Sequence, residues 1–305
     1  MSRETQTAPF QPMLRLFKNP YLLLALAGLF WAGNHIAGRA AAGEVPPISM
    51  AGMRWWIGAA LMWPFVHRQV RRDLPEMIAS WKVILPMIIG GGAIFSALQY
   101  TALNYTVALN ASIFNSFAPV VIGAAGALLF RDRFTILQMI GIVVSLAGVF
   151  NIAARGDFEV LRTLTFNYGD ILLLINMAVW AIYCACLRLL PKVDPLSFTF
   201  VLALLTGVIL FPGFLWEHFN GYQFKATWTT FFVMAYVSIF PGVLAYICWN
   251  GGQEQIGASR AAIFLHLIPI YGALLATTLL GEQLRLFHIV GFVMILIGVW
   301  LAARK

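Results

Sequence analysis

Two groups of polar and aromatic residues stand out, because each repeats at helical spacing inside a strongly apolar segment. The first group is Trp31, Asn34 and His35, and the second group is Asn176, Trp180 and Tyr183. Residues three or four positions apart share one face of a helix. Amide, imidazole and indole groups are costly in an apolar environment, so they usually face a cavity or a hydrogen-bonding partner. These faces could bind a polar, partly apolar solute, or they could only join neighbouring helices.

Other apolar segments carry single polar residues of the same kind. The candidates for contact with a bound solute are Tyr100, Asn115, Tyr246 and His266. Some of these side chains must pack between helices, so both roles stay open for each of them. Arg54 also lies within an apolar segment. For Arg54 we favour pairing with backbone carbonyls or snorkelling to the interface, and a carboxylate-binding role is the less favoured interpretation.

The charged residues limit which solute such a site could take. All 12 Asp and Glu residues lie in tails, turns or helix ends, which argues against a buried counter-ion for a strongly cationic solute. The sequence has no cluster of Lys and Arg in apolar segments for a phosphorylated compound and no glycine-rich phosphate loop for ATP. The three cysteines lack metal-ligand spacing, so we expect no metal and no cofactor. A neutral or zwitterionic, partly apolar solute remains.

The elements that must position these residues are membrane-spanning helices. Of the 305 residues, 61% are hydrophobic and 10% are charged, a far more apolar composition than that of a soluble domain. The net charge of +8 comes from basic residues in short turns and tails, which set membrane topology. The sequence therefore predicts a lipid-bilayer protein with no nucleic-acid partner. We expect a monomer, and the sequence leaves a dimer open.

Apolar segments of about twenty residues, enough to cross a hydrocarbon core of about 30 Å, divide the chain into ten predicted helices. Their ranges are 21–41, 48–66, 83–103, 108–130, 135–154, 170–190, 195–214, 229–250, 257–280 and 286–303. The predicted organisation is a tail at 1–20, a first unit at 21–154, a connection at 155–168 and a second unit at 169–305.

The two units are copies of each other. Residues 108–150 reappear without a gap at 258–300, and Trp31 and Trp180 correspond to each other at a similar offset. Because each unit has five predicted helices, an odd number, the second copy must insert upside down relative to the first. The predicted fold is all-α, with ten transmembrane helices arranged as two inverted five-helix repeats around a central cavity.

The distribution of Lys and Arg predicts the orientation in the membrane. One side of the membrane, the side of the amino terminus, receives Arg3, Arg15, Lys18, Arg68, Arg71, Arg72, Lys82, Arg131, Arg133, Lys192, Arg304 and Lys305. The other side receives Arg155, Arg162, Lys225 and Arg285. We therefore expect both termini to be cytoplasmic.

Glycine and proline residues indicate where the helices could bend. A run of three glycines centred on Gly91 weakens the predicted helix 83–103. Pro119 and Pro269 occupy equivalent positions in the two copies and interrupt their helices. These three residues are candidates for gating, and static kinks that permit close packing are the alternative.

Several of these features together resemble a known family. The stretch at 30–34, the hairpins containing Pro119 and Pro269, and the glycine pairs that close each copy at 141 and 148 and at 291 and 298 look like EamA-type members of the drug/metabolite transporter superfamily. The resemblance covers nearly the whole chain. It implies a ten-helix secondary transporter with a central cavity, and many such relatives export amino acids, aromatic ones among them.

Three hypotheses about function follow. We favour export of small neutral or zwitterionic metabolites, most of all amino acids including aromatic ones, across a bacterial inner membrane by alternating access. The alternative is efflux of other metabolites or drugs by the same fold. An intramembrane enzyme would need His35 and His266 as bases or metal ligands, and no His-Glu-x-x-His or paired-aspartate pattern supports it. The same two histidines would have to carry protons if export is proton-driven, and facilitated diffusion is the alternative.

Overall fold

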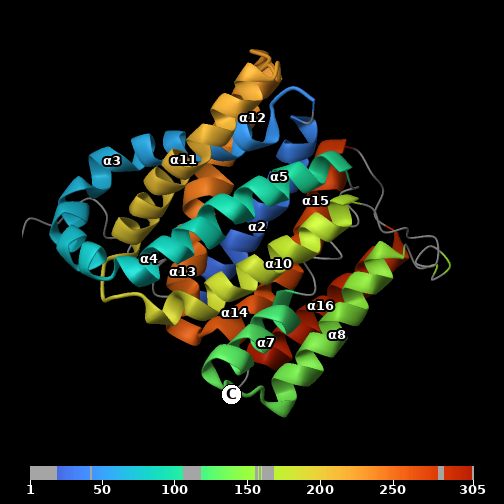
Figure 1. The fold of residues 1–305 in the computed structure, drawn as a ribbon. Helices are drawn as coiled ribbons and strands as arrows, with labels where there is room; N and C mark the ends of the chain where they lie inside the picture. Colours follow the sequence, from blue (N-terminus) through green and yellow to red (C-terminus); the bar gives the residue numbers. More distant parts are fainter. Residues whose placement is uncertain are drawn as a thin grey trace, which may run out of the picture.

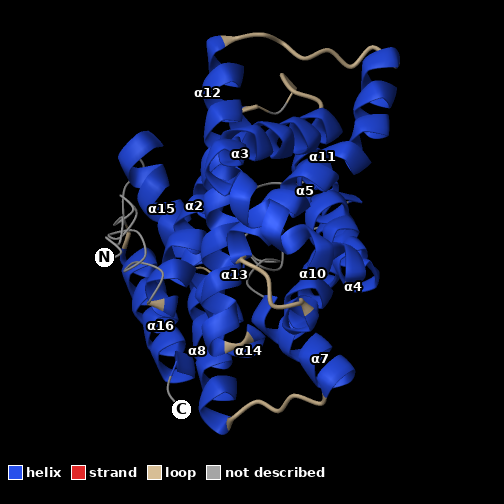
Figure 2. Cartoon of the chain, turned by 90° about the vertical axis from the view of Figure 1, so that its left-hand side faces the viewer, coloured by secondary structure: helices blue, strands red, loops and turns tan. Residues whose placement is uncertain are grey.

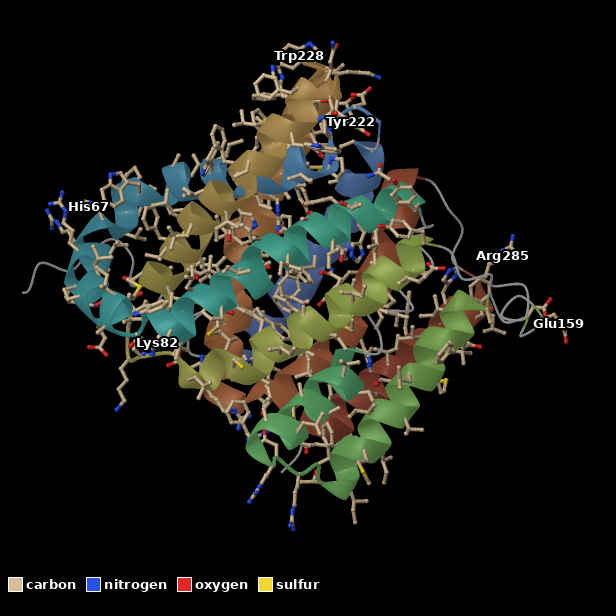
Figure 3. All side chains as sticks on the ribbon, in the orientation of Figure 1. His67, Lys82, Glu159, Tyr222, Trp228 and Arg285 are labelled. Atoms are coloured by element: carbon tan, nitrogen blue, oxygen red, sulfur yellow. The ribbon has the colours of Figure 1, made fainter. Side chains whose placement is uncertain are left out.

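The computed structural model describes residues 19–41, 43–105, 118–154, 157, 159, 168–280 and 285–303. Within these residues the regular secondary structure is entirely helical. Helices that are far apart in the sequence pack side by side in one bundle (Figure 1), and Figure 2 shows the same residues coloured as helix and loop. The side chains labelled in Figure 3, among them Lys82, Glu159 and Arg285, lie at the periphery.

Each of the ten predicted spans contains a described helix. In the first half these are α2 (Pro20–Ala40), α3 (Pro47–Ala79), α4 (Trp81–Met87) continued by η1 (Ile88–Ile94) and α5 (Phe95–Tyr105), α7 (Ala118–Phe130) and α8 (Ile136–Ala153). In the second half they are α10 (Tyr168–Cys186) with η2 (Leu187–Leu189), α11 (Pro195–Phe219), α12 (Trp228–Val237) continued by η3 (Ser238–Leu244) and α13 (Ala245–Ile256), α14 (Ala258–Ala262) continued by η4 (Ile263–His266) and α15 (Leu267–Leu280), and α16 (Leu286–Ala303).

Many of these helices are long and apolar enough to cross a membrane. Within the described residues, five stretches meet this condition: Pro20–Gly38, Trp81–Tyr105, Tyr168–Leu189, Pro195–Phe219 and Trp228–Ile256. Shorter apolar helices cover Ala118–Phe130, Ile136–Ile152 and Leu286–Leu301. The chain is therefore a multi-pass membrane protein, as its composition predicts.

The packing between helices shows a pseudo-twofold relation between the halves. The first helix, α2, packs on α13 and α15, and its counterpart α10 packs on α5 and α7. Because α13 is the counterpart of α5 and α15 is the counterpart of α7, these two sets of contacts are equivalent in the two halves. The other large contacts, α3 with α11 and α8 with α16, each join a helix to its own counterpart. The predicted fold of two inverted five-helix repeats is confirmed.

The contact between α8 and α16 depends on equivalent glycines in the two halves. A Cβ atom at Gly148 would lie 2.7 Å from the carbonyl oxygen of Gly291, and a Cβ atom at Gly298 would lie 2.5 Å from the carbonyl oxygen of Gly141. These distances are far below ordinary van der Waals contact, so the backbones touch because side chains are missing. The glycine pairs that mark the repeat in the sequence therefore hold its two copies together.

A wide π-helical turn interrupts the third helix of each half. The first turn, η1, spans 88–94, and the second, η3, spans 238–244, 150 positions later. The glycine run at 90–92 lies in η1, whereas Pro241 and Gly242 lie in η3. Proline has no N–H to donate to the preceding turn, which favours such a local widening. The local weakening predicted at Gly91 therefore takes the form of a π-helical turn.

Three helices are longer than the sequence predicts. The predicted helix 48–66 continues as α3 to Ala79, the predicted helix 195–214 continues as α11 to Phe219, and the predicted helix 229–250 continues as α13 to Ile256. Charged residues after Val66 suggested a loop, but Val66, Val70 and Met77 are buried on one face while Arg71 is exposed. An apolar stripe with this spacing is typical of an amphipathic helix that extends beyond the membrane.

The additional turn of α11 has a role in capping α3. Both oxygens of the Glu217 carboxylate accept hydrogen bonds there, from the N–H of Ile48 at 2.9 Å and from the N–H of Ser49 at 2.7 Å. The Ser49 hydroxyl donates to the same carboxylate at 2.6 Å. The first N–H groups of a helix have no partner within the helix and favour negative charge. Glu217 therefore fixes the start of α3, which carries Arg54.

Candidate functional site

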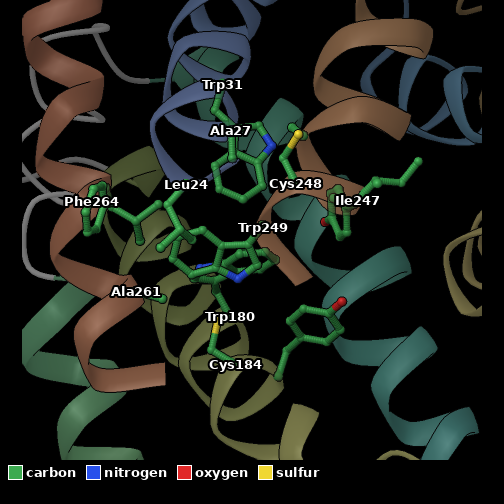
Figure 4. Close-up of a cluster of buried hydrophobic side chains, with 14 of the residues drawn as sticks. Leu24, Ala27, Trp31, Trp180, Cys184, Ile247, Cys248, Trp249, Ala261 and Phe264 are labelled. Carbon is green, nitrogen blue, oxygen red and sulfur yellow. The ribbon is translucent and has the colours of Figure 1, made fainter. Parts of the chain in front are cut away.

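Aromatic rings from both halves meet at the centre of the bundle. Trp31 from α2 and Trp180 from α10 contact edge to face, with ring centroids 5.4 Å apart and an interplanar angle of 89°. Trp249 packs 5.4 Å from Trp31 and 5.8 Å from Trp180, and Figure 4 shows the three indoles together. The two tryptophans that correspond in the repeat are therefore direct neighbours.

A small cavity of about 40 Å³ adjoins these rings. Its lining comes from both halves: Trp31, Asn34, His35, Arg54, Phe95, Gln99, Tyr100, Ala118, Met177, Trp180, Tyr246, Leu265 and Ile268. This volume holds roughly three water molecules and is far below the roughly 300 Å³ of a small ligand site. The structure thus represents a contracted state, and a solute can enter only if the surrounding rings move.

A tyrosine and an asparagine are hydrogen-bonded on each side of the tryptophan pair. Tyr100 donates to Asn34 Oδ1 at 2.7 Å, and Tyr183 donates to Asn250 Oδ1 at 3.0 Å. Asn34 corresponds to Tyr183 in the repeat, and Tyr100 corresponds to Asn250. Each bond therefore lies within one half, and the positions of the amide and the phenol are exchanged between the halves. Since each bond lies one turn beyond its tryptophan and the halves are inverted, the bonds lie toward opposite ends of the bundle.

Arg54 is the cationic side chain of the cavity lining. Its Nη2 donates to Ser96 Oγ at 2.7 Å, and Trp55 Nε1 donates to the same oxygen at 2.9 Å. The guanidinium carbon lies 4.7 Å from the centre of the Trp55 ring and 5.4 Å from that of Tyr100. Arg54 therefore contributes to the cavity. The sequence favoured pairing with backbone carbonyls or snorkelling to the interface, and the buried Arg54 side chain does not snorkel.

A second, larger space of about 320 Å³ lies between α4, η1 and α10. Gly91 and Tyr183 both line it. A Cβ atom at Gly91 would collide with the Tyr183 ring, and the Gly91 carbonyl accepts a hydrogen bond from the Tyr246 hydroxyl at 2.8 Å. Because Tyr246 lines the central cavity, Gly91 and these two tyrosines form the boundary between the two spaces.

The cavity brings together most of the residues that the sequence suggested. Trp31, Asn34, His35, Tyr100, Trp180 and Tyr246 line it. Asn176 does not line the cavity itself, but its side chain donates a hydrogen bond to Oε1 of Gln99, a lining residue, at 3.0 Å. Tyr183 stacks on Trp180 and faces the second space.

Two candidates fall elsewhere. His266 is fully buried in η4 and is hydrogen-bonded to Ser145 of α8, so it faces the helix pair α8 and α16 and does not line the cavity. An imidazole at this position cannot meet a solute in the contracted state. Asn115 lies outside the described residues.

The two proline candidates for gating are both buried. Pro269 is the third residue of α15 and follows the tighter 3₁₀ turn η4. A missing N–H at Pro269 removes a hydrogen bond to the preceding turn, which accounts for this irregularity. Pro119 is the second residue of α7, and the residues before Ala118 lie outside the described part of the chain.

Sequence reasoning did not single out Phe95, and it gave Arg54 little weight. Phe95 is one aromatic residue among many in apolar segments, so the sequence carries no signal that separates it from packing residues. Arg54 did carry a signal, because it is the charged residue within the predicted helix 48–66. In the residues that the structure describes, no group of three or more His, Cys, Asp or Glu side chains gathers as metal ligands do.

Comparison with known proteins gives consistent results. The sequence profile of the EamA-like transporter family matches residues 18–154 and, a second time, residues 167–304. An uncharacterized transporter of Archaeoglobus fulgidus is 28% identical over 288 residues, which cover 93% of this chain and 97% of that protein. The uncharacterized transporter YyaM of Bacillus subtilis is 25% identical over 289 residues, 93% of either chain. A solved crystal structure with 17% sequence identity shares the fold, with a TM-score of 0.71 and coverage of 93% of this chain and 96% of that one.

Proposed function

Because the chain belongs to the EamA-like transporter family, we propose that it is a secondary transporter that exports small neutral or zwitterionic metabolites across a bacterial inner membrane. Amino acids, including aromatic ones, are the favoured cargo. The observation that carries this proposal is the central cavity, whose lining combines indole, phenol, amide and imidazole groups from both inverted halves. Indole and phenol rings offer an apolar face and a hydrogen-bonding edge, which suits the side chain of an amino acid.

The proposed mechanism is alternating access. The cavity lies where the two repeats meet, and at about 40 Å³ it must widen before a solute can bind. The hydrogen bond between Tyr100 and Asn34 closes one end, and the bond between Tyr183 and Asn250 closes the other. Breaking one bond while the other persists would open the cavity toward one side at a time.

The test is counterflow of radiolabelled amino acids and other metabolites in proteoliposomes that contain the full chain. We predict that Trp31→Ala and Trp180→Ala each lower transport by roughly tenfold or more, because a truncated central aromatic anchor typically costs at least about 2 kcal/mol. Trp81→Ala is the matched control, since Trp81 is 55% exposed at the start of α4 and lies outside the cavity lining.

Removing a buried indole can also destabilise the fold, by about 3–5 kcal/mol. Trp31→Phe and Trp180→Phe keep most of the ring volume and therefore serve as milder variants. The melting temperature of every variant is measured together with its transport, so that a loss of stability can be separated from a loss of transport. Normal transport by both alanine variants would refute the assignment of the site. Transport of drugs or other metabolites in place of amino acids would retain the transporter and replace the cargo.

A further inference from the structure

Arg54 is a deeply buried cation without a matching anion in the described structure. Its relative exposure is 3%, and its Nε has no hydrogen-bonding partner. The ion pairs among the described residues involve Arg72 and Arg188, and none involves Arg54. The hydroxyl groups of Ser96, Tyr100 and Tyr246 and two ring faces compensate the charge only in part, because a desolvated guanidinium normally requires an anion as well as hydrogen bonds.

The fold itself does not require an arginine at this position. Arg54 is the eighth residue of α3, which begins at Pro47, and Leu202 is the eighth residue of α11, which begins at Pro195. The two helices are equivalent in the repeat and pack against each other. Leu202 is fully buried and satisfies the same architecture with an apolar side chain. A charge that is present in only one of the two copies points to the cavity and its cargo.

From these observations we infer that Arg54 binds a carboxylate of the transported compound and so sets the substrate class of the proposed site. Guanidinium binds carboxylate through two parallel hydrogen bonds, and the buried Nε that lacks a hydrogen-bonding partner provides one of the donors. The rest of the lining is largely apolar and aromatic, with Phe95, Leu265 and Ile268 beside the tryptophans. The cargo is therefore a monocarboxylate with an apolar body.

The same arrangement separates organic acids from amino acids. The described cavity lining contains no Asp or Glu that could pair with an ammonium group. A carboxylate without an amino group therefore binds at least as tightly as the corresponding amino acid, and the net anionic acid is the preferred form. This inference rests on the proposed transport function, and it replaces the neutral or zwitterionic cargo of that proposal by an anionic one.

The test uses three sets of probes that share one body within each set. The indolyl set is indole-3-propionate, tryptophan, tryptamine and indole-3-propionamide, and phenyl and isobutyl sets repeat the same four head groups. Counterflow in proteoliposomes and ligand-dependent melting temperature are measured for the full chain, for Arg54→Met and Arg54→Lys, and for Arg260→Met. Arg260→Met is the matched control, because Arg260 is a half-buried arginine at the start of the ninth span that does not line the cavity.

We expect the acids, and to a smaller or equal extent the amino acids, to be transported and to raise the melting temperature, while the amines and amides do neither. Arg54→Met should lower transport of the acids by at least about tenfold, since it removes the paired hydrogen bonds to a charged carboxylate. Arg54→Lys should retain part of the transport of the acids, because an ammonium keeps the charge but loses the paired donors. Arg260→Met should behave like the parent. Without ligand, Arg54→Met should melt no lower than the parent, whereas a structural arginine would lower the melting temperature.

The inference and the proposed function can fail separately. An amide or amine transported as well as its acid, or unchanged transport of the acids by Arg54→Met, would overturn the role of Arg54 and leave the transporter intact. If no probe is transported by the parent, the proposed cargo fails, and the melting experiment then decides about Arg54. Stabilisation by acids that depends on Arg54 would support the carboxylate site, and no stabilisation by any acid would eliminate it.

Discussion

At the scale of single residues, the two tyrosine–asparagine bonds show how inverted repeats can preserve an interaction without preserving its residues. Asn34 aligns with Tyr183 and Tyr100 with Asn250, so neither position looks equivalent by residue type. Both partners of each bond have nevertheless exchanged together. The polar residues were recognisable from the sequence, but this pairing was not, because it joins helices that are far apart in the chain.

We predict that Tyr100→Phe and Tyr183→Phe lower stability by similar amounts, about 1–3 kcal/mol each. Each change removes one hydroxyl and leaves a buried amide oxygen without a donor. The measurement is the free energy of unfolding in detergent. Tyr105→Phe serves as the control, because that tyrosine is 57% exposed.

The double variant tests whether the two bonds are independent. Since they join separate pairs of helices, the two losses should add within about 0.5 kcal/mol. If one of the two single variants loses stability and the other does not, the two bonds are not equivalent.

At the scale of helices, the extension of α3 beyond the predicted span depends on a buried aspartate. Asp73 accepts a hydrogen bond from Arg72 Nε at 2.7 Å and another from the backbone N–H of Asp194, before α11, at 2.9 Å. The hydrogen bond from the Arg72 side chain lowers the pKa of Asp73 to about 2, although burial opposes this change. Asp73 thus connects the end of α3 to the start of α11.

The lowered pKa predicts a pH dependence for this connection. An unfolded aspartate has a pKa of about 3.9, so folding favours the carboxylate form. Its contribution to stability is complete above about pH 4 and is lost as the pH falls toward 2. Asp73→Asn should therefore flatten the melting temperature between about pH 4 and pH 2, while Glu76→Gln, an exposed change on the same helix, should not. Equal pH profiles for the parent and Asp73→Asn would contradict this assignment.

The helices were predictable because hydrophobic length and internal repetition are local properties of a sequence. The additional turns of α3 and α11 were not, because their charged residues resemble a loop until the buried stripe of Val66, Val70 and Met77 has a partner to cover it. The capping of α3 by Glu217 joins residues more than 160 positions apart. The π-helical turns depend on packing against neighbouring helices as well as on glycine and proline.

At the scale of the whole molecule, the repeat gave the architecture and also most of the cavity. Trp31 and Trp180 could be paired from the sequence because they are identical residues at equivalent positions. Arg54 could not be assigned with the same argument, since the other half carries leucine at its equivalent position. His266 looked equally suitable for the cavity, but the 3₁₀ turn η4 and the bond to Ser145 direct it to α8. Local irregularity of a helix changes which face a residue occupies, and periodicity alone does not reveal it.

The proposed orientation predicts where the termini and one turn lie. A reporter that is active only in the cytoplasm should give signal when fused to either terminus, because the predicted topology places most Lys and Arg residues of the loops on that side. The same reporter inserted between residues 281 and 286 should be silent. A carboxyl terminus on the opposite side from the amino terminus would contradict the odd number of spans in each half.

The paired π-helical turns also carry information about the history of the chain. Such a turn accommodates an additional residue within a helix, which is a rare arrangement. Here it occupies 88–94 in one half and 238–244 in the other, the same place in both. One insertion before the halves were joined explains this, whereas a later origin would need two insertions at one site. The shared position of the wide turn is therefore what the duplication predicts, since both halves derive from one five-helix sequence.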